Sequence, residues 1–125
     1  MKRLVPVLCV LSVVLLGGCL TTPSGNDYAD ALRELTPLAE QGDASAQYNL
    51  GMMYYKGHGV FKKRKNYKTA VKWYRLAAEQ GDAAAQLNLG WMHEKGLGVP
   101  QDDKTAVKWY TLAAKQGFAN AQYNL

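Results

Sequence analysis

A chain of 125 residues, 48% of them hydrophobic and 20% charged, has the size and composition of one globular domain. Its 12 glycines, four prolines and two cysteines exclude a collagen-like or low-complexity protein, a disulfide scaffold and a four-thiolate zinc site. A formal charge of +5 would be compatible with binding to nucleic acid, but part of that charge lies in the first residues of the chain.

Residues 1–18 have the layout of a signal peptide: a basic start at Lys2 and Arg3 is followed by an uncharged, almost wholly aliphatic stretch at 4–16. That stretch is shorter than the roughly 20 residues that cross a bilayer. The sequence Leu-Gly-Gly-Cys at 16–19 resembles the lipobox of bacterial lipoproteins, whose cysteine receives a diacylglycerol and, after cleavage, an acyl chain. The resemblance implies that Cys19 is acylated, for example with palmitate, and anchors the protein to a membrane.

Cleavage before Cys19 removes two basic residues and leaves 13 against 10 acidic ones, a formal charge of +3, so nucleic acid is not expected as a partner. In the lipoproteins that the segment resembles, a residue other than Asp after the cysteine favours the outer membrane, and here it is Leu20. We therefore expect an outer-membrane lipoprotein of the bacterial cell envelope that faces the periplasm. Residues 19–26 offer nothing to pack and are predicted to form an acylated tether.

The remainder of the chain, 27–125, repeats itself. Ala-Glu-Gln-Gly-Asp at 39–43 recurs at 78–82, and Lys-Thr-Ala-Val-Lys-Trp-Tyr at 68–74 recurs at 104–110, an offset of 36. Gly57 and Gly59, in contrast, return at an offset of 39. The difference places three extra residues between Gly59 and Lys68 of the first copy.

Apolar residues in each unit recur at helical spacing, which predicts helices at about 28–41, 44–56 and 83–95. Two further helices are predicted to begin directly after the cap residues Asn66 and Asp102. Asp43 and Asp82 are placed to cap the helices that follow them. Gly51 and Gly90 fall inside helices, which indicates that a neighbouring helix approaches the backbone there. The repeat units are about 28–56, 66–95 and 103–125, the last one incomplete.

Ala-Gln-Leu-Asn-Leu-Gly at 85–90, Gly-Leu-Gly-Val at 96–99, the segment 102–110 and Leu-Ala-Ala-Lys-Gln-Gly at 112–117 resemble the Sel1-like repeat family, which is related to tetratricopeptide repeats. The resemblance covers about residues 28–125. It implies an all-α fold, a short α-solenoid of stacked antiparallel helix pairs. Physical reasoning agrees, because one helix pair buries its apolar faces only by stacking on the next.

The sequence gives little support for a catalytic or a metal-binding site. No pattern of ligands surrounds His58 or His93, so neither a metal nor a cofactor is expected. Some secreted relatives are reported to bind or hydrolyse β-lactams, and Thr69 with Lys72 and Thr105 with Lys108 have the spacing of a nucleophile and its lysine. Both pairs lie in the first turn of a helix, near its cap, and the repeats lack the cysteines of those relatives. We therefore expect no enzyme.

A basic run follows the first glycine pair and consists of Lys62, Lys63, Arg64 and Lys65. It is expected to be a solvated loop; the alternative is binding to an anionic surface such as lipid head groups.

One side of the helices at 44–56 and 83–95, opposite their apolar face, carries aromatic and apolar residues: Tyr48, Met52 and Tyr55 in the first copy, and Leu87, Trp91 and Glu94 in the second. Related solenoids bind partners along the wall lined by such helices, and aromatic residues carry interface energy. These six residues therefore either bind an unidentified protein partner or contact the preceding helix of the array. The predicted function is a membrane-anchored protein–protein interaction adaptor; the alternatives are a β-lactam-binding or hydrolysing protein and an immunity-type inhibitor of a toxin.

The sequence ends with Gln-Tyr-Asn-Leu at 122–125, the same residues as at 47–50, so the array stops in mid-helix. Two turns of helix are too short to be stable alone, and a solenoid needs a cap on its last apolar face. We expect either a fragment of a longer repeat protein or self-association or partner binding through this uncapped helix.

Overall fold

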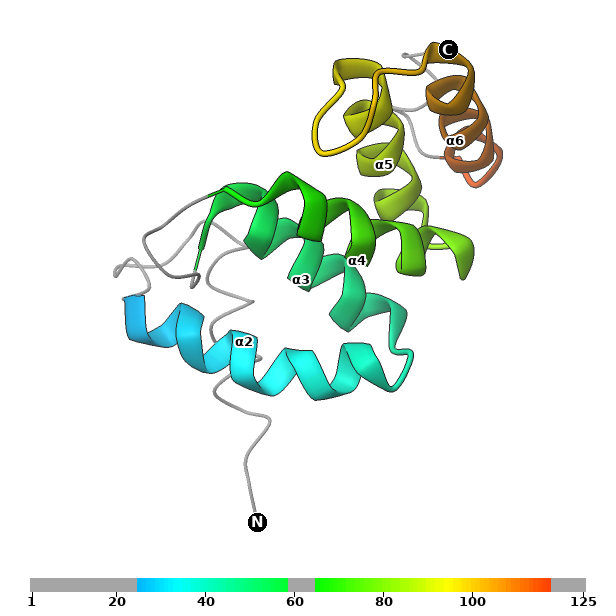
Figure 1. Cartoon of the computed structure of the whole chain (residues 1–125). Coiled ribbons are helices and arrows are strands. Elements are labelled where there is room, and N and C mark those ends of the chain that lie inside the picture. The colour runs from blue at the N-terminus through cyan, green and yellow to red at the C-terminus, as the bar shows by residue number, and fades with distance from the viewer. Residues whose placement is uncertain (1–24, 59–64, 118–125) are drawn as a thin grey trace.

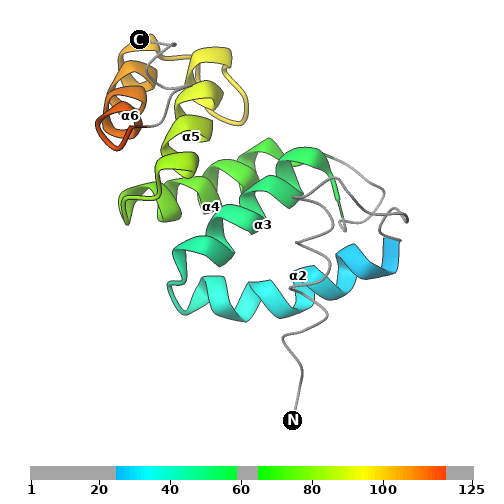
Figure 2. The same ribbon diagram turned by 180° about the vertical axis from the view of Figure 1, so that it is seen from behind.

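The computed structural model describes residues 25–58 and 65–117, and these residues form helices joined by short turns (Figures 1 and 2). The helices of the described residues are α2 (Gly25–Glu40), α3 (Ala44–Lys56), α4 (Tyr67–Glu79), α5 (Ala83–Lys95) and α6 (Asp103–Lys115). Both views show α2 at one end of the stack and the pair of α5 and α6 at the other, with α3 and α4 between them. The predicted all-α solenoid of stacked helix pairs is confirmed.

Several predictions from the sequence fall outside the described residues. They concern the signal segment 1–18, Cys19, the basic residues Lys62, Lys63 and Arg64, and the C-terminal segment 118–125. Helix α2 begins at Gly25, so the last two residues of the predicted tether 19–26 belong to this helix. None of the helices in the described ranges is long and apolar enough to cross a membrane.

The helix boundaries follow from the predicted caps. The Asp43 carboxylate accepts a hydrogen bond of 2.7 Å from the amide of Ala46, and Asp82 accepts one of 2.8 Å from Ala85. In the same way the side chain of Asn66 caps α4. Each cap satisfies an amide of the first helical turn that would otherwise have no partner. Because the cap types recur at the repeat offsets, the helices begin at equivalent positions.

Helix α4 lies between two clusters of apolar side chains. The first cluster combines buried residues of α2 and α3 with Trp73 of α4. The second combines other residues of α4, such as Val71 and Tyr74, with buried residues of α5. A helix that is apolar on two sides cannot be stable at a surface. The fold therefore depends on the stacking of successive helices, as expected for a solenoid.

The two helical glycines mark close crossings, as predicted. A Cβ atom at Gly51 would lie 2.5 Å from the Tyr74 ring, and one at Gly90 would lie 2.7 Å from the Tyr110 ring. Real Cβ atoms are not found at such distances from ring carbons. Glycine is thus required at both positions because a tyrosine of the paired helix occupies the space of a side chain.

Buried glutamines join successive helices. The Gln47 amide donates a hydrogen bond of 3.0 Å to the carbonyl of Ala39 and accepts one of 2.7 Å from Gln80. Gln86 repeats the arrangement 39 residues later: it donates to Ala78 and accepts from Gln116. The two carbonyls also accept backbone bonds from Gly42 and Gly81, so the glutamines add a second bond to each and pair their own buried amides.

The connections within the two helix pairs differ in length but share one hydrogen bond. The amide of Asn66 donates to the carbonyl of Tyr54 at 2.9 Å, and the amide of Asp102 donates to the carbonyl of His93 at 2.9 Å. These donor and acceptor positions are equivalent in the repeat. The three extra residues of the first connection therefore leave the start of α4 in the same relation to α3 as α6 has to α5.

Candidate functional site

The predicted contact residues of the first copy lie inside the array. Tyr48 packs on the Tyr74 ring with 5.9 Å between ring centroids, and Tyr55 packs on the Tyr67 ring at 5.5 Å. Met52 is half-buried against the same cluster of α4 and α5. Tyr48, Met52 and Tyr55 are therefore half-buried residues that pack within the array. Their ring contacts are with α4, the following helix, and not with the preceding one as the alternative assumed.

Two hydroxyl groups of this interior region converge on one amide. Burial raises the pKa of the Tyr48 hydroxyl and of the Tyr74 hydroxyl, and a hydrogen bond with the Asn88 side chain of α5 partly offsets the shift in both. The two phenols are thus protonated at neutral pH. They act as polar links between α3, α4 and α5.

The second copy presents a different surface. Leu87 is half-buried, whereas Trp91 is 40% exposed on α5. The ammonium group of Lys95 lies 4.8 Å from the centre of a Trp91 ring and 3.7 Å from a carboxylate oxygen of Glu94.

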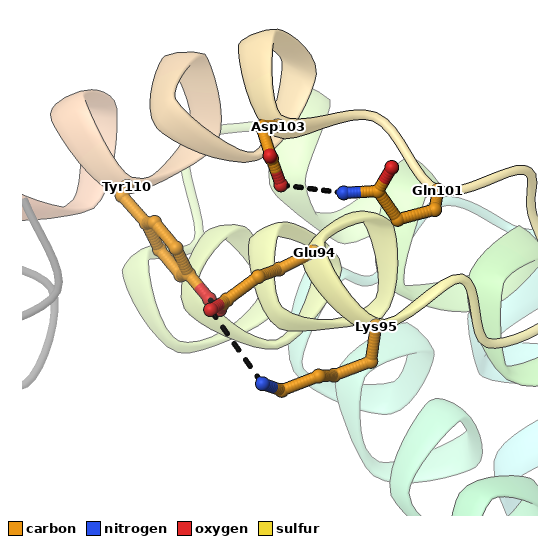
Figure 3. A network of polar contacts seen from close by, with 5 residues as sticks. All are labelled: Glu94, Lys95, Gln101, Asp103 and Tyr110. Atoms are coloured by element: carbon orange, nitrogen blue, oxygen red, sulfur yellow. Dashed lines mark hydrogen bonds and ion pairs between the residues drawn. The ribbon is translucent and has the colours of Figure 1, made fainter.

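Glu94 connects this surface to α6. Its carboxylate accepts a hydrogen bond of 2.7 Å from the hydroxyl group of Tyr110 (Figure 3). Figure 3 also shows the Lys95 side chain directed toward the same carboxylate, and the pair of Gln101 and Asp103 at the start of α6. Burial, the bond to Glu94 and the charge of that carboxylate all raise the pKa of Tyr110. Glu94 therefore links α5 to α6, while its side chain is still 37% exposed.

Val107 of α6 is a second exposed apolar side chain of this helix pair. Val71, its equivalent in α4, is 4% exposed, whereas Val107 is 50% exposed. The heptapeptides that contain the two valines are identical, so the difference comes from their surroundings alone. We call Leu87, Trp91 and Val107 the open face.

The remaining predicted residues do not gather into a site. Lys65 is exposed, and its three basic neighbours in the sequence lie outside the described residues. Among the residues that the structure describes, no group of three or more His, Cys, Asp or Glu side chains could hold a metal ion.

The two histidines occupy different positions of the repeat and have different surroundings. His58 packs on the Tyr28 ring at 4.5 Å. Within the described part of the chain, His93 has a buried Nδ1 atom without a hydrogen-bond partner. Burial lowers the pKa of His93, and the charge of Arg75 lowers it further, while Asp102 opposes the shift.

The threonine–lysine pairs have structural surroundings. The amide of Thr69 donates to the cap residue Asn66. The hydroxyl group of Thr105 donates a hydrogen bond of 2.6 Å to the carboxylate of Asp102. Lys72 and Lys108 are exposed, and the ammonium group of Lys72 lies over the Trp73 ring. The interactions around both pairs are thus those of helix starts.

Comparison with known proteins identifies the repeat. The Sel1 repeat profile matches residues 44–82 and 83–118, which are the helix pairs α3–α4 and α5–α6 with the turns that follow them. The chain belongs to the Sel1 repeat family. The residues of the open face all belong to the second of these two Sel1 repeats.

Solved structures of Sel1 repeat proteins resemble this one over nearly the whole chain. A Sel1 repeat protein from Oxalobacter formigenes is 36% identical, with a TM-score of 0.76 over 94% of this chain and 44% of that one. A protective antigen of uropathogenic Escherichia coli strains is also 36% identical, with a TM-score of 0.76 over 93% of this chain and 23% of that one. Cysteine rich protein B of Helicobacter pylori is 25% identical, with a TM-score of 0.74 over 93% of this chain and 80% of that one.

A shorter match is found in a Sel1-like repeat-containing protein of Acanthamoeba polyphaga mimivirus, which is 51% identical over 35 residues, 28% of this chain and 6% of that protein. This chain thus spans less than half the length of the mimivirus, Oxalobacter and Escherichia coli proteins.

Sequence reasoning found Leu87 and Trp91 but missed Val107. Val71 and Val107 stand at the same place in identical segments, so the sequence gives no sign that their exposure differs.

Proposed function

We propose that this Sel1 repeat protein is an adaptor that binds another protein and is anchored to a bacterial membrane through an acylated Cys19. The repeats supply the binding surface and carry out no catalysis. The lipobox-like segment that ends at Cys19 supports the anchor. Leu20 supports an outer-membrane position with the repeats in the periplasm.

One observation carries the binding part of the proposal. Trp91 and Val107 are 40% and 50% exposed on a face whose equivalents in the preceding repeat are covered. Large exposed apolar side chains are candidates for interaction sites, and tryptophan is enriched among the residues that dominate binding energy.

Photo-crosslinking in cells tests this proposal. A photoreactive phenylalanine analogue at position 91 should give one discrete crosslinked protein species in the membrane fraction. The control carries the analogue at position 76, because Leu76 is similarly exposed, at 37%, but belongs to α4. Crosslinks from both positions in equal yield, or from neither, would contradict the adaptor function.

A second assay separates the adaptor from an enzyme. The purified protein should not turn over a chromogenic β-lactam. Turnover that is lost in Thr69→Ala or Thr105→Ala would replace the adaptor by the catalytic alternative. Identification of the crosslinked species as a toxin would in turn make the protein an inhibitor.

A further inference from the structure

Basic side chains form one exposed stripe along α4. Lys68, Lys72 and Arg75 stand at positions i, i+4 and i+7 of this helix and therefore share one face, and Lys65 lies three residues before Lys68. All four side chains are exposed, and we call them the α4 stripe. Leu76, which is 37% exposed, stands four residues after Lys72 on the same side of the helix.

The charges of the α4 stripe are not neutralised by the rest of the molecule. All acidic residues of the chain belong to the described ranges, and within those ranges none of them forms an ion pair with the stripe. The ammonium group of Lys72 lies 5.3 Å from the centre of a Trp73 ring, a contact that leaves its charge intact. The stripe thus presents its four cations against a single carboxylate on the same helix, that of Glu79 at its end.

The opposite charge dominates α2. This helix has one basic residue, Arg33, and four acidic ones: Asp27, Asp30, Glu34 and Glu40. The guanidinium group of Arg33 lies 3.4 Å from the carboxylate of Asp30, which reduces its effect on the surroundings. A negatively charged surface would therefore repel α2 and attract α4, and this difference would turn the molecule toward one orientation.

The α4 stripe begins near the end of the molecule that leads to the predicted anchor. Both views show the starts of α2 and α4 on the same side of the stack (Figures 1 and 2). The connection that leads to α4 touches α2 there, since the His58 ring packs on the Tyr28 ring at 4.5 Å. The six steps of chain from Cys19 to Gly25 span at most about 22 Å. A membrane that holds an acylated Cys19 would thus be within reach of the stripe.

We propose that the α4 stripe lies against the anionic phospholipid head groups of the membrane that holds the protein. The proposal rests on the acylated anchor of the proposed function. The acyl chains hold the protein on the membrane, and the stripe fixes its orientation through the attraction between basic residues and a negatively charged leaflet. Leu76 would enter the boundary between head groups and acyl chains, where an apolar side chain beside cations is favourable.

Helix α6 offers a matched control. Lys104 and Lys108 are exposed and stand in the heptapeptide that is identical to the one of Lys68 and Lys72. Helix α6 has neutral residues where the first and last members of the α4 stripe stand, and it lies at the opposite end of the stack from α2 (Figure 1). The same change of charge can therefore be made at equivalent positions, one pair near the anchor and one pair far from it.

Fluorescence quenching with the acylated full-length mature protein in vesicles tests the proposal. The chain after Cys19 contains no further cysteine, so Leu76→Cys provides a single thiol for an apolar, environment-sensitive dye. One set of vesicles contains phosphatidylcholine alone and the other adds phosphatidylglycerol, and both carry a quencher on the head groups. We expect quenching in the anionic vesicles and little in the neutral ones. High salt should abolish it, because salt screens the attraction.

Charge reversal gives the second readout. Lys68→Glu combined with Lys72→Glu should lower the ratio of docked to undocked protein in anionic vesicles by about 30-fold or more. The control, Lys104→Glu combined with Lys108→Glu, should keep this ratio within about threefold of the unchanged protein, since those charges lie beyond the screening length of the membrane.

Equal quenching in neutral and anionic vesicles, or equal losses with the two charge reversals, would overturn the proposal. Protein that floats with the vesicles while the dye stays unquenched would refute docking of the stripe and leave the anchor standing. Protein that does not float with the vesicles would refute the anchor, and this proposal with it.

Discussion

The ring of Tyr74 lies against the backbone of Gly51, so closely that a methyl group at position 51 would stand 2.5 Å from Cδ1 of the ring. The same relationship joins Tyr110 to Gly90 in the second repeat. Each Sel1 repeat is thus closed by a tyrosine that fills the space left by a missing side chain on the paired helix.

Gly51→Ala should therefore destabilise the protein. Alanine favours the helical backbone by about 1 kcal/mol, but the overpacking costs about 1–3 kcal/mol, and the Tyr74 ring belongs to a buried side chain that has little room to move. The free energy of unfolding, measured by urea denaturation, should fall by up to about 2 kcal/mol. In a Tyr74→Ala background the same substitution should cost less or become stabilising. An equal loss in both backgrounds would show that the ring contact is not the cause.

Gln86→Leu should cost about 1–1.5 kcal/mol, because it removes a buried hydrogen bond to the carbonyl of Ala78, which keeps its bond from the amide of Gly81. Gln116→Leu removes only the outer member of the same chain of hydrogen bonds. It should cost less than about 1 kcal/mol, since Gln116 is exposed and water can replace it. Urea denaturation of both variants measures the difference. Equal costs would indicate that the buried bond to Ala78 contributes nothing beyond the exposed one.

Mild acid should weaken the fold through His93. The folded state holds the pKa of His93 below its ordinary value of 6.5, so the unfolded chain binds the proton more readily. The contribution of this group to stability is present above pH 6.5 and is lost as the pH falls through that value toward the lower folded pKa. In His93→Gln the unfolding free energy should depend less steeply on pH over this range.

His58 has the same sign of shift, because burial and Lys56 lower its pKa, and His58→Gln serves as a separate control for its share. Asp102 acts in another range, since its hydrogen bonds with Thr105 lower its pKa from 3.8. Its contribution is lost only under stronger acid. A pH profile that is unchanged in His93→Gln would contradict the assignment to this side chain.

Cys19→Ser should release the protein from membranes. A serine cannot form the thioether to the diacylglycerol, so the chain should move to the soluble fraction and stop incorporating labelled palmitate. The control Cys9→Ser lies within the predicted signal peptide and should keep both properties. Membrane association of Cys19→Ser at the original level, with no palmitate in the unchanged protein, would refute the anchor.

The local features of the fold could be predicted from the sequence. The helices at Ala44–Lys56 and Ala83–Lys95 match their predicted ranges, and the caps at Asp43, Asn66 and Asp82 form the expected bonds. These features depend on residues a few positions apart, so spacing and residue type are sufficient. The crossings at Gly51 and Gly90 were also predictable, because a glycine inside a helix has few other reasons to be there.

The candidate site was less predictable, because it depends on which neighbour covers each face. Helical periodicity placed Tyr48 and Leu87 on equivalent faces, but it could not show that α5 covers only the first of them. Likewise, the identical segments around Val71 and Val107 contain no information about their different burial. The difference in burial between the two valines depends on what packs against each of them in the stack.

The hydrogen bonds from Asn66 to Tyr54 and from Asp102 to His93 have a consequence for how such proteins change length. Both helix pairs begin their second helix from the same anchored amide, although the first connection is three residues longer. Insertions and deletions between 58 and 65 should therefore leave the register of the stack unchanged. A short epitope or a reporter sequence can be placed there, and new recognition sequences could evolve there without redesign of the helices on either side.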